Sequence, residues 1–155
     1  MKKIFNTSLV FAVLTLSFSA FLGAQNIEVA TFQDGLIILK MDDATLSTTF
    51  AFVLNDATLS NTQIKSATDA EGTFYYISAN GQRGSEANIK VAIILNQLST
   101  GVLVFDKETG CEMECSVEPS CTAYDQNIIA RCKTISCTCT DGTNRGCKSR
   151  VIFPK

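Results

Sequence analysis

The chain has 155 residues, with 13 basic and 15 acidic side chains, seven cysteines, and neither histidine nor tryptophan. This length predicts one domain, or one domain with a small appendage. The composition, 46% hydrophobic and 18% charged residues, argues against a disordered chain and against a long coiled coil. Without histidine, the chain cannot supply a Ser-His-Asp or Cys-His catalytic arrangement, a histidine base or a histidine-ligated metal.

The N-terminus has the pattern of an export signal. Two lysines precede the almost uncharged apolar run Ile4–Leu22, and the small residues Gly23 and Ala24 follow it. This order predicts a signal peptide over residues 1–24 that is removed on export. A membrane anchor is the rival interpretation, because the run approaches the ~20 residues that span a bilayer, but its asparagine, serine and threonine residues make it a poor permanent span. We therefore expect no stable membrane span and a secreted or periplasmic location.

Residues 25–110 have the patterns of β-strands. Ile27–Phe32 alternates apolar and polar side chains, and the turn sequence Gln33-Asp34-Gly35 separates it from Leu36–Leu39, as in a β-hairpin. Further apolar runs are divided by glycine-containing turns, which predicts a mainly β fold, an antiparallel meander or sandwich-like segment without crossover helices. These further strands are expected at Thr73–Ser78, Ile89–Leu95 and Val102–Phe105.

The segment Asp42–Leu54 is ambiguous. Its apolar residues fit one face of a helix with Asp42 at the N-cap, whereas the run Ser47–Thr49 favours extended structure. We expect a strand here and keep, as the alternative, an α+β fold with one helix near residues 43–54.

The pentapeptide Asp-Ala-Thr-Leu-Ser occurs twice, at residues 43–47 and 56–60. Two such acidic turns could supply oxygen ligands to calcium, but the pattern lacks the alternating acids of a calcium-binding loop. We therefore interpret the copies as two turns that each lead into a strand.

Two features between residues 74 and 85 could face a ligand. Phe74-Tyr75-Tyr76 places aromatic side chains on both faces of its strand, which is typical of a strand buried on both sides and less often of a platform that stacks sugars. The segment Asn80–Ser85 lacks the lysine and the glycine spacing of a phosphate-binding loop. We expect a flexible hairpin loop there.

All seven cysteines lie at or beyond residue 111. This step in composition predicts a boundary between a β-rich segment, residues 25–110, and a small disulfide-rich tail, residues 111–155. Clustered cysteines in an exported protein are typical of disulfides, and their spacing lacks the C-x2-C pairs of a zinc knuckle. The disulfide candidates are Cys111, Cys115, Cys121, Cys132, Cys137, Cys139 and Cys147.

The number and spacing of the cysteines limit how they pair. Because seven is odd, at most three bridges form within the chain, and the remaining thiol stays free or forms an intermolecular disulfide. Cys137 and Cys139 are two residues apart in a predicted strand, so their side chains face the same side. We expect them to bridge to two different partners rather than to each other.

No residue spacing in the sequence singles out catalytic residues, a cofactor-binding loop or a metal site, and we predict none of the three. We therefore expect an exported, bacterial-type, non-enzymatic binding or interaction module with a protein or carbohydrate ligand at the cell envelope. The alternative is a small secreted hydrolase that uses carboxylates, or a thiol-disulfide exchange enzyme, although the latter usually shows a C-x-x-C motif. A metal-binding tail of thiolates comes third. Nucleic-acid binding is not expected, because the chain has no strongly basic domain.

Overall fold

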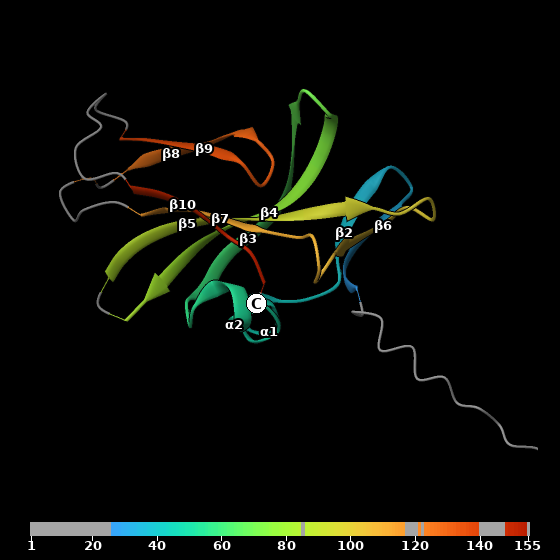
Figure 1. Ribbon diagram of the computed structural model, residues 1–155. Helices are drawn as coiled ribbons and strands as arrows, with labels where there is room; N and C mark the ends of the chain where they lie inside the picture. The colour runs from blue at the N-terminus through green and yellow to red at the C-terminus, as the bar shows by residue number, and fades with distance from the viewer. Residues whose placement is uncertain (1–25, 85, 117–120, 122, 140–147, 155) are drawn as a thin grey trace, which may run out of the picture.

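The computed structural model describes residues 26–84, 86–116, 121, 123–139 and 148–154. The signal peptide expected over residues 1–24 and the odd cysteine Cys147 both lie outside these residues. Eight strands of the described chain form one antiparallel sheet, two short helices cover one face of it, and two more strands form a hairpin over the opposite face (Figure 1). Within the described ranges, no helix is long and apolar enough to cross a membrane.

The first hairpin forms where the sequence predicts it. β1 (Ile27–Gln33) pairs antiparallel with β2 (Leu36–Leu39) through a turn at Asp34 and Gly35. The φ angles of these two residues are 51° and 79°, and positive φ at both central positions is the requirement of a type I′ turn. The other edge of β1 pairs with β6 (Val102–Phe105), which has the predicted bounds.

Residues 43–49 and 51–54 are helical, which corrects the strand that we expected over residues 42–54. α1 (Asp43–Thr49) begins after Asp42, whose carboxylate accepts a hydrogen bond from the backbone N–H of Thr45 at 2.8 Å. α2 (Ala51–Leu54) follows it directly. The helix prevails over the extended preference of the serine and threonine residues because it buries a complete apolar face in the core. The fully buried residues of this face are Leu46, Phe50, Val53 and Leu54.

The two copies of the repeated pentapeptide adopt different structures. The first copy lies in α1, whereas the second leads into β3 (Thr58–Asp69), so only the second is the strand-entry turn that we expected. The Ser47 hydroxyl accepts a hydrogen bond from the Leu59 N–H at 2.7 Å, and the Asp43 carboxylate accepts one from the Thr62 N–H at 3.2 Å. Polar side chains of the first copy therefore bind the backbone where the β3 register is interrupted.

β3, β4 (Gly72–Arg83) and β5 (Glu86–Gln97) form a meander of three long antiparallel strands. The strands predicted over residues 73–78 and 89–95 lie within β4 and β5, but the loop expected over residues 80–85 is shorter, because β4 continues through Arg83. Gly81 is therefore a strand residue. A Cβ atom added there would lie 2.6 Å from Cγ1 of Ile89, so glycine permits close packing rather than a turn.

β5 is the central strand of the sheet. One edge pairs with β4, and the other pairs first with β7 (Glu112–Ser116) and then with β6. β7 pairs in turn with β10 (Lys148–Ile152). Two strands of the predicted cysteine-rich tail thus belong to the same sheet as the strands that precede residue 111.

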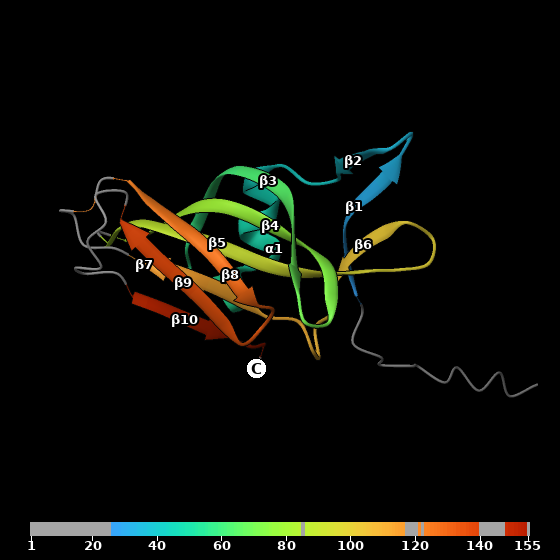
Figure 2. The same ribbon diagram turned by 90° about the horizontal axis from the view of Figure 1, so that it is seen from above.

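The other two strands of the tail, β8 (Tyr124–Ala130) and β9 (Thr134–Cys139), form the separate hairpin. It lies across the face of the sheet that is opposite to the helices (Figure 2). Three disulfides fasten it to Cys111 before β7, Cys115 within β7 and Cys121 after β7. Cys137 and Cys139 bridge to two different partners, as expected. The pairs are Cys111–Cys132, Cys115–Cys137 and Cys121–Cys139, with Cα separations of 5.6, 5.8 and 5.9 Å.

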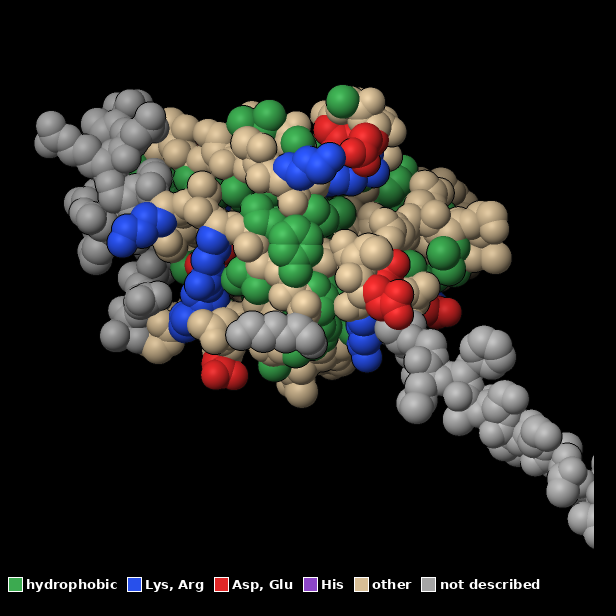
Figure 3. All heavy atoms as spheres, in the orientation of Figure 1, with side chains coloured by type: hydrophobic (Ala, Val, Ile, Leu, Met, Phe, Trp, Pro, Cys, Tyr) green, Lys and Arg blue, Asp and Glu red, His purple; other side chains and the backbone are tan. Residues whose placement is uncertain are grey.

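An ion pair fastens the turn of this hairpin to the turn between β3 and β4. Arg131 donates to both carboxylate oxygens of Asp69, at 2.7 and 2.9 Å, and to the Gly72 carbonyl at 2.9 Å. These hydrogen bonds hold the pKa of Asp69 well below its ordinary range. The guanidinium also lies 4.7 Å from the centre of the Phe74 ring. Figure 3 shows basic and acidic side chains gathered side by side at this end of the molecule.

The sheet separates two apolar cores, because alternate side chains of each strand point to opposite faces. The helix-side core contains the helix residues together with Val29, Ile77, Ile93 and Phe105. The hairpin-side core contains Phe74, Ile94, Met113, Ile128, Ile135 and disulfide sulfurs. A mainly β, antiparallel fold with a disulfide-rich C-terminal region is thus confirmed.

We expect reduction of the disulfides to release the β8–β9 hairpin while the helix-side core stays folded. The bridges span separations of 18 to 22 residues, for which loop entropy predicts a stabilisation of about 3 kcal/mol each. The helix-side core, as described, contains no cysteine. In hydrogen exchange with and without reductant, amides of β8 and β9 should lose protection and those of β4 and β5 should keep it. Simultaneous loss in all four strands would contradict this.

Candidate functional site

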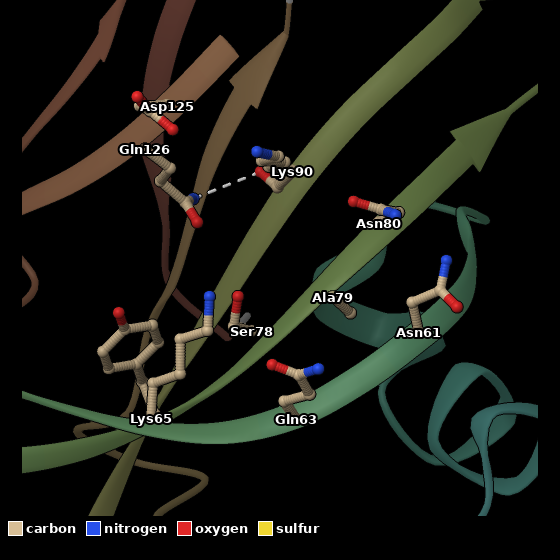
Figure 4. A pocket seen from close by; sticks show the side chains of 10 residues that line it. Asn61, Gln63, Lys65, Ser78, Ala79, Asn80, Lys90, Asp125 and Gln126 are labelled. Carbon is tan, nitrogen blue, oxygen red and sulfur yellow. Dashed lines mark hydrogen bonds between the residues drawn. The ribbon is translucent and has the colours of Figure 1, made fainter. Parts of the chain in front are cut away.

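A polar groove lies on the hairpin side of the sheet, beside the β8–β9 hairpin (Figure 4). Its volume is about 250 Å³, slightly below the ~300 Å³ at which small-molecule pockets usually begin. It therefore has room for one ring-sized group of a ligand. The lining residues come from β3, β4, β5 and β8 and are Asn61, Gln63, Lys65, Tyr76, Ser78, Ala79, Asn80, Lys90, Asp125 and Gln126.

The position of the groove follows from the order of side chains along the strands. The hairpin-side face of β4 carries Phe74, Tyr76, Ser78 and Asn80 in turn, so it changes from apolar to polar. The same face of β5 also changes from apolar at Ile94 to charged at Lys90. Ile94 pairs with Tyr76 and Lys90 pairs with Asn80, so the polar parts of the two strands lie side by side. The hairpin covers the apolar half of this face and leaves the polar half open.

Gln126 closes the groove on the side of the hairpin. Its side-chain amide donates to the carbonyl of Lys90 at 3.2 Å and to that of Met113 at 3.3 Å, and so joins β8 to the backbones of β5 and β7. Asp125 precedes it in β8 and, by strand alternation, faces the other way. Figure 4 shows Gln126 directed toward the floor of the groove and Asp125 directed away from it.

Two lysines give the groove its charge, and they differ in what they contact. The Lys90 ammonium donates to the Tyr124 carbonyl and lies 4.9 Å from the centre of the Tyr124 ring, so it holds the hairpin on the sheet. Lys65, from the exposed part of β3, extends along the groove and has no ion-pair or hydrogen-bond partner among the described residues. Its ammonium is therefore available to a ligand.

The aromatic run of β4 contributes one residue to the groove. Phe74 packs in the hairpin-side core, and Tyr75 packs on the opposite face with its ring centre 5.3 Å from that of Phe32, so the strand is buried on both sides here. Tyr76 lies at the border of the hairpin-side core and the groove. Burial raises the pKa of its hydroxyl, which remains a hydrogen-bond donor at neutral pH.

The chemistry of these side chains is that of polar recognition. The amides and hydroxyls donate and accept neutral hydrogen bonds, and the Lys65 ammonium attracts negative charge. Asp125 is the only acidic residue among those that line the groove. In the part of the chain that the structure describes, no group of three or more acidic or cysteine side chains is arranged to hold a metal ion.

The six cysteines that the structure describes hold the hairpin that borders the groove, and none of these six lines it. Cys147 falls in the part of the chain that is not described. The groove was not predicted from the sequence, chiefly because no strand was expected over the β3 residues, which include Gln63 and Lys65. The change from aromatic to polar residues at every second position of β4 was the pattern that could have revealed it.

Two further acidic residues lie on the helix-side face of β7. Glu114 is 2% exposed and accepts hydrogen bonds from Arg83 at 2.8 and 3.2 Å and from Arg150 at 2.8 Å. Arg83 also donates to the carbonyls of Leu54 and Asn55 at the end of α2, at 2.7 and 2.9 Å. A cation at a helix C-terminus satisfies exposed carbonyls, so this cluster joins the helix to the sheet.

Glu112 is the exceptional buried acid. It is 0% exposed, and neither carboxyl oxygen has a hydrogen-bond partner among the described residues. Burial, and secondly the nearby charge of Glu114, raise its pKa from an ordinary 4.5 to about 8. Raised pKa values occur in catalytic acids. Glu112, however, pairs with Ile93 of β5 on one side and Ile152 of β10 on the other, and it lies on the face away from the groove. Its effect is therefore on stability.

Comparison of the chain with protein-family models, curated proteins and solved structures found no match. The chemistry of the groove is therefore the basis for a functional assignment.

We expect the free energy of unfolding of the natural protein to fall as pH rises, because Glu112 is buried. The substitution Glu112→Gln should abolish this fall. Below pH 4.5 Glu112 is protonated in the folded and unfolded chains. Between 4.5 and about 8 the unfolded chain releases this proton and the folded chain keeps it, so the free energy of unfolding falls by at most about 1.4 kcal/mol per pH unit.

Urea unfolding at pH 5 and pH 7.5 measures this effect. The stability of E112Q relative to the natural protein should increase between the two pH values, whereas the control Glu108→Gln, in an exposed turn, should show no such increase. An identical pH dependence in E112Q and the natural protein would show that Glu112 ionises normally.

Proposed function

We propose that this protein is an exported, non-enzymatic binding module and that the polar groove is its ligand site. The N-terminal pattern over residues 1–24 supports export. The three disulfides support it independently, because such bonds persist in oxidising compartments outside the cytoplasm. Both observations favour a secreted or periplasmic site of action.

The observation that carries this proposal is the open polar half of the sheet face beside a covalently fastened hairpin. β3, β4 and β5 are paired beneath the groove, except where the β3 register is interrupted between Ser60 and Gln63, and the hairpin is held by disulfides, Gln126 and Lys90. The backbone that carries the donors and acceptors of the groove is therefore in place before a ligand arrives, which lowers the entropy lost on binding. A preformed polar site of this kind suits a binding protein.

The size and polarity of the groove favour a carbohydrate over a protein as the ligand. Stable protein–protein interfaces bury ~800 Å² on each partner and have an apolar centre. The groove has room for one ring-sized group, and it is lined chiefly by amide, hydroxyl and ammonium groups. Sugars present hydroxyl groups that match such a lining.

The enzymatic alternatives find less support in the same residues. A hydrolase that uses carboxylates needs two of them on either side of the scissile bond, whereas Asp125 is the only acid that lines the groove and is directed away from it. A thiol-disulfide exchange enzyme, or a thiolate metal site, needs free thiolates. Six cysteines of the described chain are in disulfides that lie outside the groove.

A substitution that fills the groove tests the proposal. Ser78 is half-buried on the groove floor, so Ser78→Tyr should occupy the ligand volume. The matched control is Ser66→Tyr on β3, which is exposed and does not line the groove. On an array of saccharides and peptides, the natural protein and S66Y should bind the same ligand, and S78Y should bind it at least tenfold more weakly.

Three results would contradict the proposal. The first is that S78Y, with an unchanged melting temperature, binds the ligand as tightly as the natural protein does. The second is that the natural protein binds no ligand on the array. The third is conversion of the bound ligand to a product of different mass, which would make the protein an enzyme.

A further inference from the structure

We propose that the groove selects an acidic saccharide, in which Lys65 pairs with the carboxylate of a uronic acid unit and neighbouring amides bind its hydroxyls. This inference rests on the proposed function and specifies the ligand of the same site. It follows from the charge, the spacing and the polarity of the groove.

The charge of the groove favours a negatively charged ligand. Lys65 has no carboxylate partner within the described residues, and Asp125 is directed away from the groove floor. The other lysine, Lys90, is held by Tyr124 but adds positive charge at the opposite edge of the floor. A ligand carboxylate would therefore complete an ion pair that the protein leaves open.

The spacing of the polar side chains fits one sugar unit. Gln63 lies opposite Ser78 in the β3–β4 register, and Lys65 lies opposite Tyr76, two residues further along the same face. Two residues of a strand span ~7 Å, and adjacent strands are ~4.8 Å apart. Four polar groups thus surround an area comparable to a sugar ring, and one sugar unit can contact all of them. They are the Lys65 ammonium, the Gln63 amide and the hydroxyls of Ser78 and Tyr76.

The polarity of the groove argues against apolar ligands and single small anions. Among its lining residues, Ala79 alone has an aliphatic side chain, and the aromatic ring of Tyr76 lies at one end. A lipid or an apolar peptide would leave many amide groups without hydrogen bonds, which is costly. A simple anion would use Lys65 and leave the amides of Gln63 and Asn80 unused, whereas an acidic saccharide uses both kinds of group.

Titration with three probes tests this inference on the oxidised, full mature protein. The probes are a uronic acid tetrasaccharide, the same tetrasaccharide with its carboxylates reduced to alcohols, and tetraglutamate. Amide chemical shifts in NMR spectra locate the contact, and calorimetry measures the affinity. We expect the acidic tetrasaccharide to shift Gln63, Ser78 and Asn80 and to bind at least tenfold more tightly than either other probe.

Substitution of the lysine tests its role directly. Lys65→Gln should weaken binding of the acidic tetrasaccharide at least tenfold and leave binding of the reduced form within twofold. The control Lys107→Gln removes another exposed charge, from the β6–β7 turn outside the groove, and should change neither affinity. Unchanged spectral dispersion in both variants confirms that they are folded.

Each of the remaining outcomes would contradict a different part of the proposal. Equal binding of the reduced tetrasaccharide at the groove would refute selectivity for charge but leave the groove as a binding site. Tighter binding of tetraglutamate would assign the site to acidic peptides. If none of the three probes shifts a groove amide, the acidic-saccharide ligand is wrong, while the array comparison of S78Y with S66Y still decides separately whether the groove binds any ligand.

Discussion

The covalent attachment of the β8–β9 hairpin to β7 is the constraint on which the rest of this structure depends. β7 is itself paired with the central strand β5, so three disulfides connect the hairpin to the middle of the sheet. The hairpin has a limited apolar surface of its own and gains order mainly by this attachment. Where it is fastened decides which half of the sheet face is covered, and so where the polar groove opens.

Noncovalent contacts then fix the hairpin at both of its ends. Arg131 joins its turn to the β3–β4 turn, and Lys90 and Gln126 hold β8 beside the groove. The helix-side face is organised differently, because Glu114 and its two arginines compensate each other there while Glu112 is buried without a partner. The Glu114 charge is thus compensated within the helix-side face, whereas Lys65 on the other face has no ion-pair partner among the described residues.

Much of the sheet could be predicted from the sequence because its strands carry strong local patterns. The Asp34-Gly35 turn has positive φ at both positions, and the Asp-Gly pair between two apolar runs is a strong local signal of a hairpin. The repeated pentapeptide shows where such reasoning ends, since identical residues form a helix once and enter a strand once. Burial of Phe50 and Leu54 decides the first case, and burial depends on contacts that are distant in sequence. The groove depends on distant contacts in the same way, because its lining residues from β3 and from β8 border one cavity only when the disulfides hold β8 on the sheet.

The position of the hairpin depends on which cysteines are paired, and mapping the disulfides determines this pairing. Proteolysis of the oxidised protein without reduction, followed by mass spectrometry, identifies which cysteine-containing peptides are linked. The structure predicts links between Cys111 and Cys132, Cys115 and Cys137, and Cys121 and Cys139. Any other pairing, such as Cys115 with Cys139, would place the hairpin differently on the sheet, and a groove bordered by Gln126 would then not form there.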